Sequence, residues 1–134
     1  MARKHSRTLA CTREDAAQRL AQAQAFADLA EMDPYSSDGP TRSAAVSNAV
    51  LAASAASDAV CCKRLGRHSS DGDHARALEL LSEAGEAGGK AHTQLATLLS
   101  LKNKASYERT DPTVAEAKKA IRSMKAIIKL AREL

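Results

Sequence analysis

Hydrophobic positions along most of the chain recur every three or four residues, the spacing that places side chains on one face of a helix. The clearest stripe falls within residues 112–132 and consists of Val114, Ala117, Ile121, Met124, Ile128 and Ala131. Weaker stripes cover residues 13–32 and 91–107, where alanine and leucine occupy most of the apolar positions. This pattern predicts amphipathic helices separated by polar turns.

Capping residues and helix breakers set the expected boundaries. Thr12 with Asp15 is a loose capping box, and Asp33-Pro34 ends the first helix because the residue before a proline avoids the helical region. Gly66 is a natural end for the second helix, and Asp111-Pro112 is a start signal for the last. Caps at Thr41 and Ser70, and three glycines at 85, 88 and 89, mark the remaining limits. The sequence therefore predicts helices over residues 13–32, 41–65, 70–84, 91–107 and 112–132.

Composition narrows the fold class. Hydrophobic residues make up 44% of the 134 residues, but aromatic residues only 2%, so alanine and leucine must build the core. Alanine buries little area, and such a core is stable only where long helices approach closely. Sheets favour the β-branched and aromatic residues that are scarce here. We expect an all-α fold, an up-and-down bundle of four or five helices over residues 13–134, preceded by a basic disordered tail at residues 1–12.

Cysteines and hydropathy bear on the cellular compartment. The three cysteines, Cys11, Cys61 and Cys62, are odd in number and have no zinc-ligand spacing with one another or with a histidine. Neighbours on a helix point about 100° apart and rarely form a disulfide. Neither a signal peptide nor a membrane-spanning segment is apparent. We expect reduced thiols in a cytoplasmic protein with no metal, no cofactor and no membrane association.

Charge suggests a polyanion as one class of partner. The formal net charge is +4, and a row of cations follows one side of the last predicted helix: Lys118, Arg122, Lys125, Lys129 and Arg132. Such a row could follow a phosphate backbone. It could equally be the solvated face opposite a buried stripe. With only three aromatic residues, a platform that stacks single-stranded bases is disfavoured.

A second basic cluster lies where the second predicted helix ends, and comprises Lys63, Arg64, Arg67 and His68. Cations there are favoured by the negative end of the helix dipole. An anion site at the end of the bundle accounts for the cluster equally well.

Two further places carry candidate chemistry. Asp58 stands among alanine and serine on the helix expected to be central, and a buried carboxylate there must find a cation, several donors or a proton. It could order a functional cation, form a structural hydrogen bond or simply be exposed. Asn103 and Tyr107 lie one turn apart, with Lys102 nearby, either as a candidate catalytic group or as an ordinary polar helix end. No established catalytic motif occurs.

Four stretches in this order resemble the HEPN family of small prokaryotic helical bundles from toxin–antitoxin and defence systems. They are residues 21–26, 47–66, 73–81 and 99–107, and the likeness spans about residues 13–132. The resemblance implies a bundle that often dimerises, with a nucleotidyltransferase-type antitoxin or another protein as a possible partner.

The same resemblance implies a metal-independent ribonuclease site in catalytic members, built on an Arg-x4–6-His motif at a dimer interface. Here Lys102 stands where the arginine is expected, and Tyr107 stands where the histidine is expected. Tyrosine, with a pKa near 10, is a poor base at neutral pH. Arg67 and His74 have the literal spacing but fall before the third helix.

We therefore expect a non-catalytic protein that binds RNA, a nucleotide or a protein partner. A weak ribonuclease using Lys102, Asn103 and Tyr107, with Arg64 or Arg67 holding phosphate, is one alternative. A purely structural adaptor is the other. All three residue groups, 102–107, 63–68 and Asp58, are expected to meet in one cleft.

Overall fold

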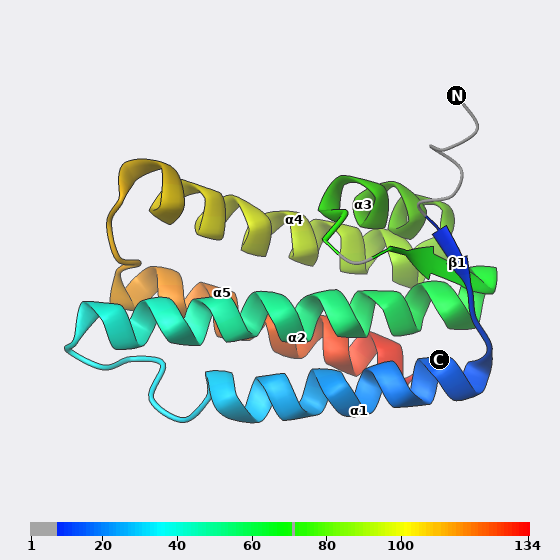
Figure 1. Cartoon of the computed structure of the whole chain (residues 1–134), viewed down its shortest axis with the longest axis horizontal. Helices are drawn as coiled ribbons and strands as arrows, with labels where there is room; N and C mark the ends of the chain where they lie inside the picture. Colours follow the sequence, from blue (N-terminus) through cyan, green and yellow to red (C-terminus); the bar gives the residue numbers. More distant parts are fainter. Residues whose placement is uncertain (1–7, 71) are drawn as a thin grey trace.

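Five helices pack side by side in the computed structural model, which describes residues 8–70 and 72–134 (Figure 1). The all-α bundle predicted from the sequence is confirmed. Its helices are α1 (Arg13–Ala30), α2 (Gly39–Leu65), α3 (His74–Glu83), α4 (Gly85–Glu108) and α5 (Val114–Arg132).

The long helix α2 runs through the middle of the molecule and packs against each of the other four helices (Figure 1). More than half of its 27 residues are buried, and half of these are alanine. Small side chains let neighbouring helices approach closely, which offsets the small area that each alanine buries. By length and composition α2 could cross a membrane, but 78% of its apolar window is buried inside the bundle. It is therefore the central core helix of the bundle.

A short two-stranded sheet closes one end of the bundle. Strand β1 (Thr8–Ala10) pairs antiparallel with β2 (Arg67–Ser69), and Leu9 lies opposite His68. Residues 8–10 were expected to be disordered and residues 67–70 to form a loop. Gly66, with a φ of +71°, turns the chain back after α2, and its carbonyl accepts a 2.9 Å hydrogen bond from the backbone of Cys11. Residues 1–7 of the predicted tail lie outside the described residues.

Helix α1 begins at Arg13 as predicted, with Thr12 and Asp15 as its capping box, whereas the starts of α2, α3 and α5 differ from the predictions because other side chains act as caps. Asp38 caps α2 through the backbone N–H of Thr41, the residue expected to be the cap. Asp73, and not Ser70, caps α3. Thr113 and Glu116 form a complete capping box on α5, which begins at Val114, two residues after the proline expected to begin it.

The largest difference concerns the glycines between α3 and α4, which were expected to form a loop. Gly85, with a φ of +76°, turns the chain, and α4 begins there instead of near residue 91. Gly88 lies against the last turn of α3, where a Cβ atom would meet the Leu81 carbonyl oxygen and Ala84. These glycines therefore permit a close contact between two helices.

Candidate functional site

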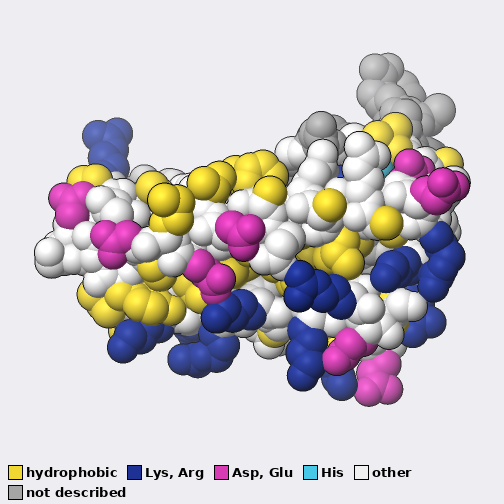
Figure 2. Space-filling view, turned by 90° about the horizontal axis from the view of Figure 1, so that it is seen from below, with side chains coloured by type: hydrophobic (Ala, Val, Ile, Leu, Met, Phe, Trp, Pro, Cys, Tyr) yellow, Lys and Arg dark blue, Asp and Glu magenta, His cyan; other side chains and the backbone are white. Residues whose placement is uncertain are grey.

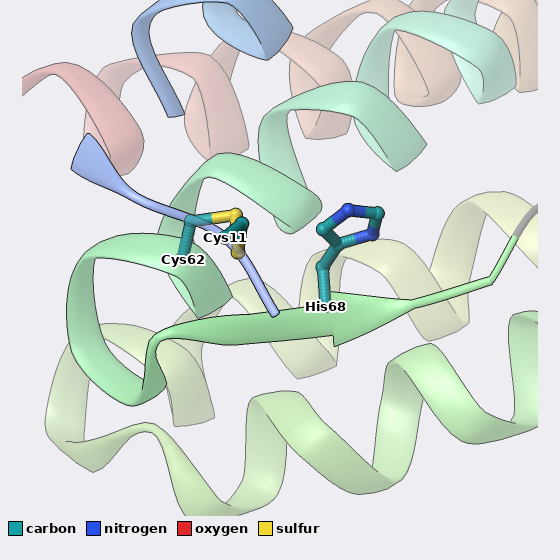
Figure 3. Close-up of side chains that lie close together, drawn as sticks. All are labelled: Cys11, Cys62 and His68. Atoms are coloured by element: carbon teal, nitrogen blue, oxygen red, sulfur yellow. A yellow bond between two sulfur atoms is a disulfide. The ribbon is translucent and has the colours of Figure 1, made fainter. Parts of the chain in front are cut away.

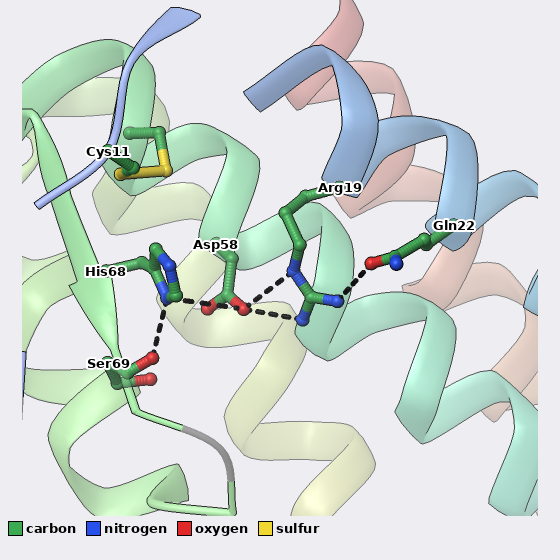
Figure 4. A network of polar contacts seen from close by, with 7 residues as sticks. Cys11, Arg19, Gln22, Asp58, His68 and Ser69 are labelled. Carbon is green, nitrogen blue, oxygen red and sulfur yellow. Dashed lines mark hydrogen bonds and ion pairs between the residues drawn. A yellow bond between two sulfur atoms is a disulfide. The ribbon is translucent and has the colours of Figure 1, made fainter. Parts of the chain in front are cut away.

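The buried carboxylate of Asp58 is the centre of a polar network on the inner side of α2 (Figure 4). Asp58 is only 7% exposed. Arg19 of α1 donates to its Oδ2 atom from Nε at 3.1 Å and from Nη2 at 2.6 Å. Nδ1 of His68 lies 3.7 Å from the same oxygen and 2.6 Å from the Ser69 carbonyl oxygen. The cation that a buried carboxylate requires is thus an arginine that the sequence analysis did not single out.

A small cavity of about 310 Å³ lies beside this network. Arg19 and Asp58 share its wall with Phe26, Ser54 and His74. The Ser54 hydroxyl is buried there without a hydrogen-bond partner in the described part of the chain. The cavity can take a small polar group, but Arg19 and Asp58 in its wall are already paired with each other.

The basic cluster at the end of α2 does not converge on one point. Lys63 donates from Nζ to the Ala131 carbonyl oxygen at 2.8 Å, which ties α2 to the end of α5. Arg67 forms a 3.3 Å ion pair with Glu83, and Arg64 is exposed. Only His68 faces Asp58. The four residues expected to hold an anion together therefore point to different neighbours.

The side chains of Lys102, Asn103 and Tyr107 are divided between two surface hollows. Lys102 lines a pocket of about 260 Å³ that also includes Ser47 of α2. Asn103 and Tyr107 line a broad groove between α3 and α4, together with Leu78. Tyr107 is 90% exposed. The three residues thus do not form one enclosed site within a single chain.

The predicted common cleft is also absent within one chain, in the part that the structure describes. Lys102 lines its pocket beside Ser47, whereas Arg64 lies 17 residues further along the same helix. At 1.5 Å per residue this separates them by about 25 Å. Figure 1 accordingly shows the end of α4 and the end of α2 at opposite ends of the bundle. Of the three groups, only Asp58 and the 63–68 corner meet, through His68.

The cationic row on α5 is exposed along its whole length, opposite the buried stripe. Lys125 is paired with Glu31 of α1 at 2.8 Å, which raises the pKa of this lysine, and Lys118 lies 5.8 Å from the Tyr35 ring centre. The side chains of Arg122 and Lys129 have no hydrogen-bond or ion-pair partner within residues 8–70 and 72–134. Seen from below in Figure 2, dark-blue Lys and Arg side chains gather along the lower half of the surface.

Cys11 and Cys62 form a disulfide, so the expectation of three reduced thiols is wrong. The prediction considered only neighbouring cysteines, whereas these two are 51 residues apart. A cytoplasmic location was inferred from reduced thiols and loses that support, since disulfides persist mainly in oxidising compartments. Cys61 remains a free, buried thiol, and burial raises its pKa to about 12.

The imidazole of His68 stands next to the disulfide (Figure 3). The potential metal-ligating atoms of Cys11, Cys62 and His68 lie within 4.8 Å of one another. The sequence analysis missed this group because the β1–β2 pairing, which it did not predict, brings Cys11 to His68.

Comparisons with known proteins identify no relative. Searches against protein-family models, curated proteins and solved structures gave no match. The resemblance to HEPN bundles therefore stays a prediction.

Proposed function

We propose that this protein binds RNA along the cationic row of α5, without cleaving it, as a non-catalytic HEPN-like bundle. One observation carries the proposal: five exposed cations follow one side of a single helix, and only Lys125 has an acidic partner among the described residues. Cations that are not neutralised internally can replace the counterions of a phosphate backbone.

The arrangement around 102–107 favours binding over catalysis. A general acid or base must lie within hydrogen-bond reach of the reacting group and be shielded from bulk water. Tyr107 is almost fully exposed, and Lys102 lines a different pocket. The ribonuclease alternative thus needs a second chain to complete the site.

The test is the affinity for a labelled RNA hairpin, measured by fluorescence anisotropy over a range of salt concentrations. We expect the double variant Arg122→Glu/Lys129→Glu to bind the RNA at least about tenfold more weakly. The slope of log affinity against log salt concentration should also become shallower, by the equivalent of about one to two phosphate contacts. Its matched control is Arg64→Glu/Lys102→Glu, which changes the net charge equally at two places away from the row.

Equal losses in both double variants, or affinity independent of salt, would contradict the proposal. Intact RNA after incubation with the wild type is also expected. Cleavage that disappears in Tyr107→Phe and in Lys102→Ala would establish the ribonuclease alternative instead.

A separate observation favours self-association as part of this function. The groove between α3 and α4 is lined largely by apolar side chains, including Leu78 and Leu99, and Tyr107 stands exposed at its edge. We propose that a second copy covers it, as the HEPN resemblance implies. Sedimentation of Tyr107→Arg should then show a weaker dimer than the wild type. Met32→Arg is the control, because Met32 is also exposed (78%) but lies outside the groove.

A further inference from the structure

The geometry points to a redox-controlled zinc site formed by Cys11, Cys62 and His68 once the disulfide is reduced. The three residues come from separate elements: Cys11 follows β1, Cys62 lies in the last turns of α2, and His68 is in the middle of β2 (Figure 3). Their ligand atoms lie within 4.8 Å of one another. Tetrahedral zinc with Zn–S bonds of about 2.3 Å needs ligands only about 3.8 Å apart, so small side-chain rotations suffice.

His68 is already oriented as a metal ligand. Its Nδ1 atom faces the Ser69 carbonyl oxygen at 2.6 Å and Asp58 at 3.7 Å, which leaves Nε2 for an ion. In Figure 4 the imidazole stands between the disulfide and this carboxylate. Metal-bound histidines almost always donate their other nitrogen to a carboxylate or carbonyl group in this way. Arg19 in turn holds Asp58 in place.

The ligand set suits zinc in chemistry as well as in spacing. Two thiolates and one imidazole neutralise and bind Zn²⁺, and a Cys₂His set with a fourth, open position is an established zinc arrangement. The site is reachable from solvent, because Cys11 is partly exposed and the His68 side chain is 16% exposed. Cys61, although adjacent to Cys62, is buried and outside the group.

The redox step requires a reductant from outside the chain, and a dithiol is the class that we propose. The dithiol transfers two electrons and two protons to the Cys11–Cys62 bond and is itself oxidised to a disulfide. Zn²⁺ then displaces the two thiol protons, which pass to water, and forms two Zn–S bonds. In the reverse direction a disulfide takes two electrons from the two thiolates and two protons from water and becomes a dithiol, which re-forms the Cys11–Cys62 bond and releases Zn²⁺. The disulfide and the metal are therefore mutually exclusive.

The test uses the tag-free 134-residue chain, oxidised or reduced with a phosphine that is then removed without oxygen. Titration with Zn²⁺, followed by calorimetry, should give no binding at this site to the oxidised protein and one equivalent bound to the reduced protein. Co²⁺ should give thiolate charge-transfer absorption only after reduction. Equal binding to the two forms, or no binding to the reduced form, would overturn the inference without any variant.

Variants assign the ligands. Cys62→Ser and His68→Gln should each weaken Zn²⁺ binding by about 100-fold or more, and Asp58→Asn by about 10-fold to 100-fold through His68. Cys61→Ala and His92→Gln are the matched controls and should bind as the reduced wild type does. Circular dichroism checks that each variant is folded. Undiminished binding in folded His68→Gln, or loss in Cys61→Ala, would place the ion elsewhere.

Discussion

Arg19 of α1 donates two hydrogen bonds to one carboxylate oxygen of Asp58 on α2, from Nε at 3.1 Å and from Nη2 at 2.6 Å. The Asp58 side chain is 10% exposed and that of Arg19 is 27% exposed. This contact joins the two helices across 39 residues of sequence and fixes the face that α1 turns toward the core.

Removal of one partner of this pair should destabilise the fold more than removal of both. Arg19→Met leaves Asp58 buried without its cation, and we expect the free energy of unfolding to fall by about 1–3 kcal/mol, less than for a fully buried pair. Arg19→Met/Asp58→Leu should recover most of that loss. Urea unfolding measures both, with Arg13→Met, on an exposed position of the same helix, as the control. Equal losses in the single and double variants would mean that the pair contributes through packing alone.

The Cys11–Cys62 bond should contribute about 2–4 kcal/mol to stability, because it closes a loop of 51 residues in the unfolded chain. Cys11→Ser should lower the midpoint of denaturant unfolding to that of the reduced wild type under metal-free conditions. Added reductant should leave Cys11→Ser unchanged. A midpoint that responds to reductant in this variant would show that another pairing exists.

The Cys61 thiol should react very slowly with thiol reagents in the native protein. Its pKa near 12, raised by burial and then by Asp58 and Glu83, leaves almost no thiolate at pH 8, and the side chain is buried. The oxidised native protein should therefore release no colour from Ellman's reagent within minutes and one equivalent after denaturation. Rapid reaction of the folded protein would contradict the burial of this side chain.

Substitution by alanine should have opposite effects on stability at Gly88 and Gly89, two neighbouring glycines of α4. Gly88→Ala forces a Cβ atom against the Leu81 carbonyl oxygen and Ala84, and we expect a loss of about 1–3 kcal/mol. Gly89→Ala meets nothing within 4 Å and should gain about 0.5–1 kcal/mol from helix propensity. Thermal unfolding of the two variants compares them directly, and an equal effect of both would refute the close contact between α3 and α4.

The Thr113–Glu116 capping box should make the free energy of unfolding depend on pH in the acid range. The Thr113 backbone N–H and then Lys104 lower the pKa of Glu116. Because the folded pKa lies below the unfolded value of about 4.3, the contribution is present above that value and is lost as the pH falls through the folded pKa. The stability difference between wild type and Glu116→Gln should therefore be present at pH 7 and shrink in acid. A difference that stays constant from neutral to acid pH would assign the effect to something other than this charge.

Sequence periodicity was sufficient for the helices but not for the contacts between them. The α5 stripe could be predicted because its spacing lies within a single helix. Residues 117, 121, 124, 128 and 131 are buried as expected, but Val114, the first of the stripe, is exposed. Boundaries failed where a neighbouring side chain was the actual cap, as at Asp38 and Asp73, or where a helix begins in close contact with another, as at Gly88. No short-range signal announces Arg19 as the partner of Asp58, or Cys11 as the partner of Cys62, because each pair is brought together only by the complete bundle.

The disulfide also makes one closed ring of α1, α2 and the segment that links them. Both bonded cysteines flank this helical hairpin, Cys11 just before α1 and Cys62 near the end of α2. A protease that cuts once between Ala30 and Gly39 would thus yield two fragments that stay covalently attached. Only a reducing agent would then separate the pieces, so a molecule cleaved once would keep both fragments and gain only the mass of one water molecule.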